Sequence, residues 1–267
     1  MSFKFKAIIA CSLLMCAAPS AFAQTSTPAQ RYDAATKLIL AKLGPAQEFR
    51  APPAETDPGV AQSLADIKAS MAVFGTDAFP IDGMTTFQSV CAPLAAMTVQ
   101  YAMAGANTLD PKADPAIQAS KLATLENANA EKYQDTLMIF GVGDARCAAM
   151  HLPFIANFWN SVPAAERTQT RIGGLRQMQS GMSQILMGLV MTSIQSPYSQ
   201  KNRDLAITTA ATYVGAFSDG LTIDDRNALL ATITQPGLGL SKAYPKEYAI
   251  IVGALSQSAC SGLCTVG

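Results

Sequence analysis

The chain has 267 residues, and 19 Lys and Arg balance 19 Asp and Glu, so its formal net charge is zero. Charged residues make up only 14% of the sequence and hydrophobic residues 49%, which excludes a chain that is disordered throughout. The neutral balance, without a basic block, argues against electrostatic binding of nucleic acid. The single histidine, His151, excludes a metal site built from several histidines, and we expect no cofactor.

The first 23 residues have the pattern of a secretory signal peptide. Two lysines form the positive start, residues 7–18 form an apolar run too short to span a bilayer, and residues 21–23 (Ala-Phe-Ala) form a cleavage site. A lipoprotein is the competing interpretation. It is less favoured because the apolar stretch before Cys11 is short and a bulky residue precedes Cys16.

Cleavage would leave a mature chain that begins at Gln24 and carries 17 Lys and Arg against 19 Asp and Glu. No later apolar run reaches the length of a membrane-spanning helix without a polar break, so we expect no transmembrane segment in the mature chain. The sequence therefore predicts an exported protein, either periplasmic or secreted.

Helical spacing of apolar residues dominates the mature chain, and the alternation typical of strands is scarce. We expect residues 24–58 to form an N-terminal helix and a Pro-rich linker, and residues 59–267 to form one all-α, multi-helix domain. The nine expected helices span residues 31–43, 60–74, 84–104, 115–140, 144–160, 163–195, 200–217, 223–234 and 245–257.

Glycines and polar residues indicate the ends of these helices. Gly141 and Gly143 are expected to end the helix that begins near residue 115, and Asp144 is expected to cap the next helix. Thr222, followed three residues later by Asp225, resembles a capping box at a helix start.

Residues 173–195 form the most apolar helix, almost without charge, which predicts a buried helix at the centre of the domain. Gly174, Gly181 and Gly188 recur every seven residues and so share one face. Each interior glycine costs roughly 1 kcal/mol against alanine, and close approach of a neighbouring helix would offset that cost.

Gln177 and Gln184 have the same seven-residue spacing on an adjacent stripe. The simpler interpretation is that both amides bond to neighbouring backbone or water, and the alternative is that they line a cavity and orient a ligand. The methionines of this helix are interpreted as core residues, although Met pairs four residues apart are also compatible with a soft metal such as Cu(I).

Four cysteines remain in the mature chain, and an exported protein favours two disulfides among them. Of the three possible pairings we favour Cys91–Cys147 together with Cys260–Cys264. If Cys147 were instead free, it would share a helix face with His151 and could act with it as a nucleophile and base.

The sequence lacks the motifs of common hydrolases: no Ser lies in G-x-S-x-G, and H-E-x-x-H is missing. Trp159 is expected in the core, with the rim of a partner-binding or ligand-binding groove as the alternative. Paired carboxylates such as Asp224 and Asp225 are read as helix-cap residues.

Three functions follow as hypotheses. The first is a noncatalytic periplasmic protein that binds another protein, as inhibitors and immunity proteins of similar build do. The second is a carrier of a small apolar ligand or a soft metal, which an apolar cavity beside Gln184 would favour. The third is a hydrolase of unfamiliar type that uses His151 or paired carboxylates, which a cleft holding His151 beside a Ser or Asp would favour.

Overall fold

The computed structural model describes residues 26–257, except positions 82, 111 and 196, together with residues 263–265. This part of the chain is all-α, with ten α-helices and five short 3-10 helices, and its only β pairing is an isolated bridge between Thr76 and Phe79. The predicted fold class is therefore confirmed. None of the described helices combines the length and hydropathy that crossing a membrane requires. The predicted signal peptide, residues 1–23, lies outside the described residues and stays a prediction.

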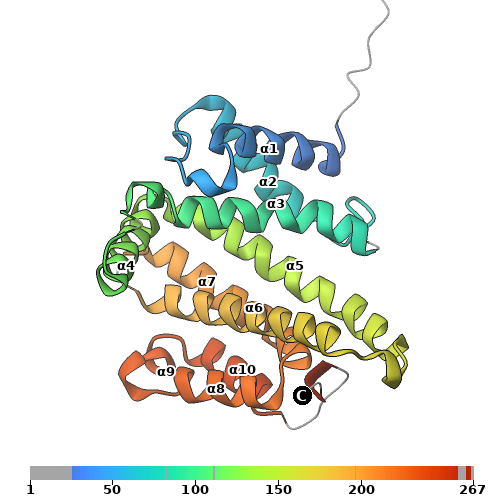
Figure 1. The fold of residues 1–267 in the computed structure, drawn as a ribbon. Coiled ribbons are helices and arrows are strands. Elements are labelled where there is room, and N and C mark those ends of the chain that lie inside the picture. The colour runs from blue at the N-terminus through green and yellow to red at the C-terminus, as the bar shows by residue number, and fades with distance from the viewer. Residues whose placement is uncertain (1–25, 82, 111, 196, 258–262, 266–267) are drawn as a thin grey trace, which may run out of the picture.

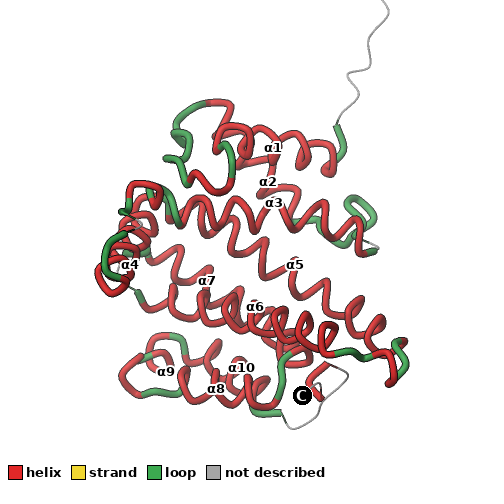
Figure 2. The backbone as a smooth tube through the Cα atoms, in the orientation of Figure 1, coloured by secondary structure: helices red, strands yellow, loops and turns green. Residues whose placement is uncertain are grey.

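The helices form a stack of layers, which can be followed in Figures 1 and 2. α1 and α2 pack as a pair against α3 and α5, α5 packs against α3 and α7, and α6 lies on α7 beside α5, with α8 and α10 beyond α7. The bounds are α1 (Pro28–Leu43), α2 (Pro58–Met71), α3 (Met84–Ala102), α4 (Pro115–Lys132), α5 (Gln134–Ser161), α6 (Gln169–Ile194), α7 (Gln200–Gly220), α8 (Ile223–Ile233), α9 (Leu240–Ala243) and α10 (Pro245–Leu255).

Two hydrophobic cores fill the stack, and α5 belongs to both. Phe140 and Cys147 of α5 pack in the core formed with α1, α2 and α3. Ala145 and Leu152 of the same helix pack in the core formed with α6, α7, α8 and α10. α1 and α2, which lie on the two sides of the predicted boundary at residue 58, share the first core.

The prediction that Gly141 and Gly143 end a helix is wrong, because α5 runs unbroken from residue 134 to residue 161. The actual break in this region comes at Tyr133, between α4 and α5. Gly143 serves close packing instead: a Cβ atom there would lie 2.3 Å from Sδ of Met71 and 2.8 Å from Cδ1 of Leu94. Asp144 is consequently an interior residue of α5 and not a helix cap.

The expected central position of the Gly-rich helix is also wrong. α6 buries one side against α7, with Leu186 and Val190 in the core, but Ser180 and Gln184 on its other side are exposed. The central helix is α5. Lack of charge in α6 does not mean burial, because small and uncharged polar residues cover its open face.

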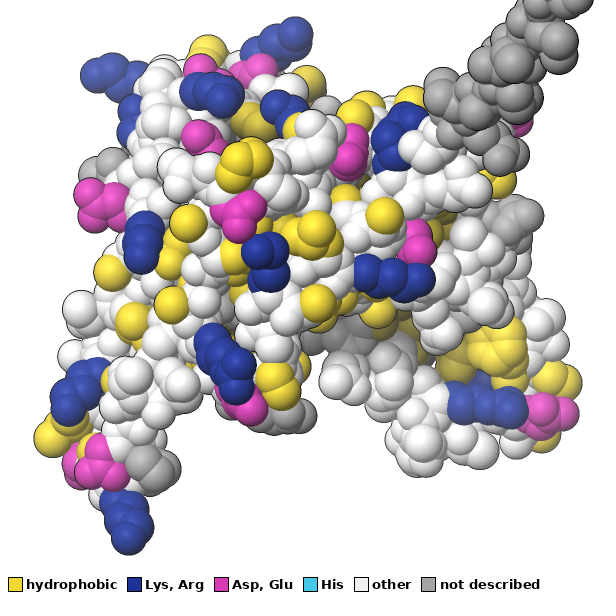
Figure 3. All heavy atoms as spheres, turned by 90° about the horizontal axis from the view of Figure 1, so that it is seen from above, with side chains coloured by type: hydrophobic (Ala, Val, Ile, Leu, Met, Phe, Trp, Pro, Cys, Tyr) yellow, Lys and Arg dark blue, Asp and Glu magenta, His cyan; other side chains and the backbone are white. Residues whose placement is uncertain are grey.

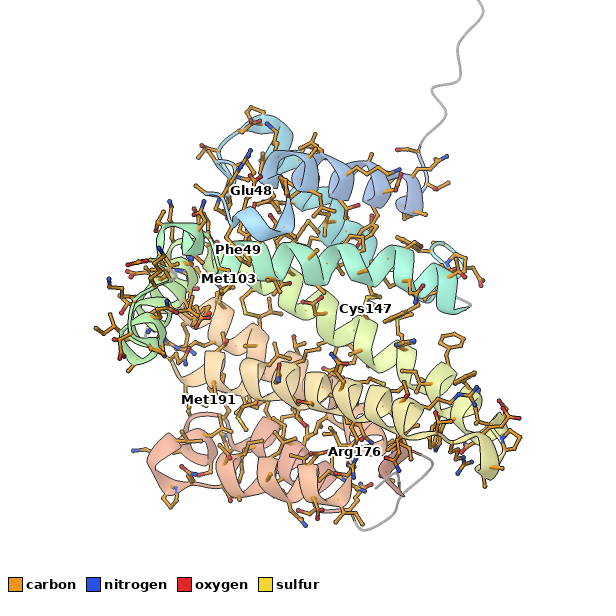
Figure 4. The ribbon with its side chains drawn as sticks, viewed as in Figure 1. Glu48, Phe49, Met103, Cys147, Arg176 and Met191 are labelled. Carbon is orange, nitrogen blue, oxygen red and sulfur yellow. A yellow bond between two sulfur atoms is a disulfide. The ribbon has the colours of Figure 1, made fainter. Side chains whose placement is uncertain are left out.

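The favoured first disulfide is confirmed, since Cys91 of α3 is bonded to Cys147 of α5. Figure 4 labels Cys147 where α5 lies against α3. Cys264 is disulfide-bonded as well. Cys260 lies outside the described residues, so the pairing Cys260–Cys264 stays a prediction.

Two glycines of α5 give a matched test of this packing. Gly143→Ala should lower the free energy of unfolding by about 1–3 kcal/mol, because its new methyl group meets Met71 and Leu94. Gly141→Ala should raise it by up to about 1 kcal/mol, because nothing lies within 4 Å of its Cβ position and alanine favours the helix. Urea unfolding of both variants measures the difference, and equal effects would contradict the packing described for Gly143.

The disulfide between α3 and α5 should contribute strongly to stability. Its cysteines are 56 residues apart, a separation for which the chain-entropy model gives on the order of 4 kcal/mol. The double variant Cys91→Ala, Cys147→Ala should unfold at a clearly lower urea concentration than the oxidised protein. Reducing agent also breaks the bond of Cys264, so the control is the double variant with and without reducing agent, which measures the effect of that other bond. If the oxidised wild-type protein and the oxidised double variant unfolded at the same urea concentration, the Cys91–Cys147 bond would carry no stability.

Candidate functional site

The candidate site is a groove that α3, α5 and α6 form together. Its floor is one row of residues along α5: Gly141, Asp144, Ala148, His151 and Ile155. These residues alternate three and four positions apart, which keeps them on one face of a helix. The three- and four-residue spacing of these residues along α5 therefore places all of them on the floor of the groove.

The walls repeat the same spacing on the neighbouring helices. One wall consists of residues of α3 and the other of residues of α6, so three helices each turn one row of side chains toward the groove. The α3 row is Gln88, Ala92, Ala95, Val99 and Ala102, and the α6 row is Met178, Gly181, Ile185, Gly188 and Thr192. Most of these residues are small or apolar.

The groove has two parts that join. The part bordered by His151 has a volume of about 600 Å³, and the part next to α4 has about 480 Å³. Four residues line both parts, and they mark the junction: Thr98, Asp144, Gln184 and Ile185. Each volume falls in the range of roughly 300–1,000 Å³ typical of small-molecule sites.

The glycines of α6 widen this groove. Gly181 lines the first part and Gly188 the second, and nothing lies within 4 Å of the Cβ position of either. The predicted close approach of a neighbouring helix to this glycine stripe is therefore wrong. Packing therefore does not offset the lower helix propensity of these glycines. Because they have no side chains, the groove is wider at their positions.

Asp144 is the ionisable group at the junction of the two parts. Its Oδ2 accepts a hydrogen bond of 2.7 Å from the hydroxyl of Thr98. No lysine or arginine among the described residues forms an ion pair with it. Burial raises the pKa of this carboxyl to about 6, and the hydrogen bond from Thr98 acts in the opposite direction.

His151 lies two turns farther along the same floor. Its ring stacks on Phe87 of α3, with ring centroids 3.5 Å apart and planes 13° from parallel. Burial lowers its pKa to about 4, so the imidazole is neutral near pH 7. Seven residues of helix separate it from Asp144 by about 10 Å, too far for a direct proton exchange between the two.

The formal charges of the described residues that line the groove are all negative. Among the described residues that line it, only Asp144 and Glu126 carry a formal charge at pH 7, and both are acidic. The outer surface differs: seen from the α1 side, charged groups of both signs are interspersed with hydrophobic side chains (Figure 3). The groove therefore differs from this outer surface, because its lining is mostly apolar and its few charged groups are acidic.

Of the four predicted ligand-binding residues, two line the groove. Gln184 and His151 do so, whereas Gln177 is exposed and is not among the lining residues. Trp159 is buried in the second core with Arg167 over its ring, so its alternative placement at a groove rim is wrong. The ring faces inward because the core side of α5 includes Leu152 one heptad earlier.

The most distinctive polar contact, between Asp144 and Thr98, has no signal in the sequence, because an Asp after two glycines is typical of a helix cap. Gln179 was also missed: its amide nitrogen donates 3.0 Å bonds to the carbonyls of Gly220 and Leu263, joining α6 to the end of α7 and to the C-terminal segment. Gln179 therefore has a structural role, whereas Gln184 of the same helix lines the groove.

The nucleophile and metal hypotheses find little support in this geometry. Cys147 is bonded to Cys91, so it has no thiol to pair with His151. No cluster of three or more His, Cys, Asp or Glu suited to a metal ion occurs within the described residues. Met178 and Met182 line the groove, but Met182 is also a buried residue of the second core, against which Met178 and Met187 pack.

Comparison with protein-family models, with curated proteins and with solved structures finds no match for this chain.

The pKa of Asp144 predicts a pH dependence of stability. Because the folded-state pKa, about 6, exceeds the ordinary value of 3.8, the contribution of this group to stability is fully present below about pH 4 and is lost as the pH rises through 6. Asp144→Asn removes this loss and keeps an acceptor for Thr98. The variant should therefore gain on the order of 2 kcal/mol relative to wild type between pH 4.5 and pH 7.5.

Urea unfolding of both proteins at the two pH values provides the measurement. His151 has the opposite effect, since its lowered pKa removes stability as the pH falls below about 6.5, but it is present in both proteins and cancels in the difference. A difference that does not change with pH would contradict a titrating carboxylate at this position.

Proposed function

We propose that this protein binds a small, elongated and mostly apolar molecule in the groove between α3, α5 and α6. The observation that carries the proposal is the continuous groove of two parts, about 600 Å³ and 480 Å³, lined by small and apolar side chains with a few polar groups at its junction. Such a combination is typical of small-molecule sites. Together with the predicted signal peptide, it suggests a carrier in the periplasm or outside the cell.

The glycines of α6 support this role. A surface helix gains stability when glycine is replaced by alanine, and the open space at Gly181 and Gly188 shows that the fold would accept a larger residue there. A requirement for an open groove explains why small residues occupy these positions. The disulfide beside the groove, which holds α3 to α5, would keep its floor and one wall in place.

A second candidate is the binding of another protein, the first of the three hypotheses from the sequence, here through an amphipathic helix of that partner. The three rows of residues at alternating three- and four-residue spacing favour it, since a fourth helix could place its own apolar face against them. Val99, at the edge of the groove, is half exposed and would be covered by such a partner.

Filling the groove tests the proposal. The neutral apolar dye N-phenyl-1-naphthylamine should bind the wild-type protein with a rise in fluorescence. Gly181→Leu and Gly188→Leu should each reduce its affinity at least tenfold, because the new side chain would extend into the groove.

Gly174→Leu is the matched control, because Gly174 lies on α6 with open space around it and is not part of the groove lining. It should leave dye binding within twofold of wild type. If the dye does not bind, or if all three variants behave alike, the proposed small-molecule site is wrong. Binding of an amphipathic peptide without binding of the dye would favour the second candidate.

A further inference from the structure

The charge within the groove indicates which kind of apolar ligand would bind there. This inference rests on the proposed function. Asp144 stands at the junction of the two parts, where a molecule that occupies both must pass it. The carboxylate has one hydrogen bond from the protein, from Thr98 to Oδ2, and Oδ1 receives none from the described residues. Oδ1 also is not among the polar atoms fully shielded from solvent without a partner, so it keeps some exposure to solvent, and Asp144 lines both parts of the groove.

The surroundings of Asp144 leave its charge without a counterion. From α3 it faces Thr98, from α6 the neutral Gln184, and from α4 the groove adds a second acidic group, Glu126. The other titratable groups near it are His151 on α5, Tyr198 at the far end of the groove, and Tyr32 of α1, whose pKa is raised in part by Asp144 itself. All three are uncharged near pH 7, and none of the described lining residues is Lys or Arg.

A charged carboxylate in apolar surroundings is unfavourable unless an opposite charge or a hydrogen-bond donor meets it. Anionic amphiphiles such as fatty acids would bring a second negative charge to this site. A protonated amine would supply the missing counterion and donate to the open oxygen.

We propose that the groove selects an apolar molecule that carries a protonated amine, with its hydrocarbon part along the apolar rows of α3 and α6 and its ammonium group at Asp144. The apolar part gives affinity through burial, and the ion pair with Asp144 gives the discrimination between charge types. Thr98 acts as a positioning residue, because its hydroxyl holds Oδ2 and leaves Oδ1 directed at the ligand.

Three compounds with the same twelve-carbon chain test this selection: dodecylamine, dodecanol and dodecanoate. Each is titrated at pH 7.5, below its micelle concentration, against wild-type protein loaded with the neutral dye. Dodecylamine should displace the dye at a concentration at least tenfold lower than dodecanol does, which corresponds to about 1.4 kcal/mol, and dodecanoate should be the weakest.

Asp144→Asn should remove the preference for the amine and leave the affinity for dodecanol within twofold of wild type. Glu131→Gln is the matched control: Glu131 is an exposed carboxylate of α4 that does not line the groove, so its removal should preserve the preference. Thr98→Val should weaken the preference without abolishing it, because the charge at Asp144 remains.

The pH gives a readout that a purely structural role of Asp144 would not change. Since the carboxyl has a pKa of about 6, the affinity for dodecylamine should fall as the pH is lowered from 7.5 to 5, while that for dodecanol stays constant. Dodecylamine remains protonated over this range, and His151 remains neutral. In Asp144→Asn the affinity for the amine should not depend on pH.

The two proposals fail separately. If the amine and the alcohol bind equally well to the wild-type protein, or if Asp144→Asn keeps the preference, the recognition by Asp144 is wrong although the apolar groove stands. If neither compound displaces the dye and the dye itself does not bind, the small-molecule site is wrong altogether.

Discussion

The structure depends on one shared element, the 28-residue helix α5, which takes part in both hydrophobic cores. One face of α5 meets α2 and α3, and another meets α6 and α7. The absence of a side chain at Gly143 lets Met71 and Leu94 contact the helix backbone, and the disulfide at Cys147 fixes α3 to it covalently. Because α5 holds both layers, the remaining strip of its surface between α3 and α6 becomes the floor of a groove.

That strip explains why the groove combines apolar walls with a few polar groups. α3 and α6 both pack against α5 or its neighbours, but neither is held tightly against the other, so the rows that face the gap are solvated. Small residues in these rows, including Gly181 and Gly188, reduce local packing and helix propensity. Asp144 adds an electrostatic cost of its own, since its charge is largely buried without a basic partner among the described residues. Unfavourable features that cluster in one groove are typical of functional sites.

Much of the fold was accessible from the sequence because helix periodicity and capping are local. The Pro93-containing α3 starts at residue 84 as expected, and the N–H of Asp225 does bond to the Thr222 hydroxyl at the start of α8. The Cys91–Cys147 pairing was also favoured correctly. The predicted helix end at Gly141 and Gly143 and the predicted cap at Asp144 are wrong for one reason. Residues that usually end or begin helices lie inside α5, where contacts with α2 and α3 override their local preference.

Periodicity and helix caps are local signals, so the all-α class and most helix positions could be predicted from the sequence. The number and spacing of the cysteines favoured the Cys91–Cys147 bond among three possible pairings. The sequence placed Gln184 and His151 among the candidate ligand-binding residues, but it could not separate them from Gln177 and Trp159. Three features could not be predicted and follow from the packing of the helices: α5 is central, α6 has an open face, and Asp144 meets Thr98 at the junction of a groove. These features arise from helices up to about 100 residues apart in the chain, and their relative placement depends on side-chain packing that no local pattern records.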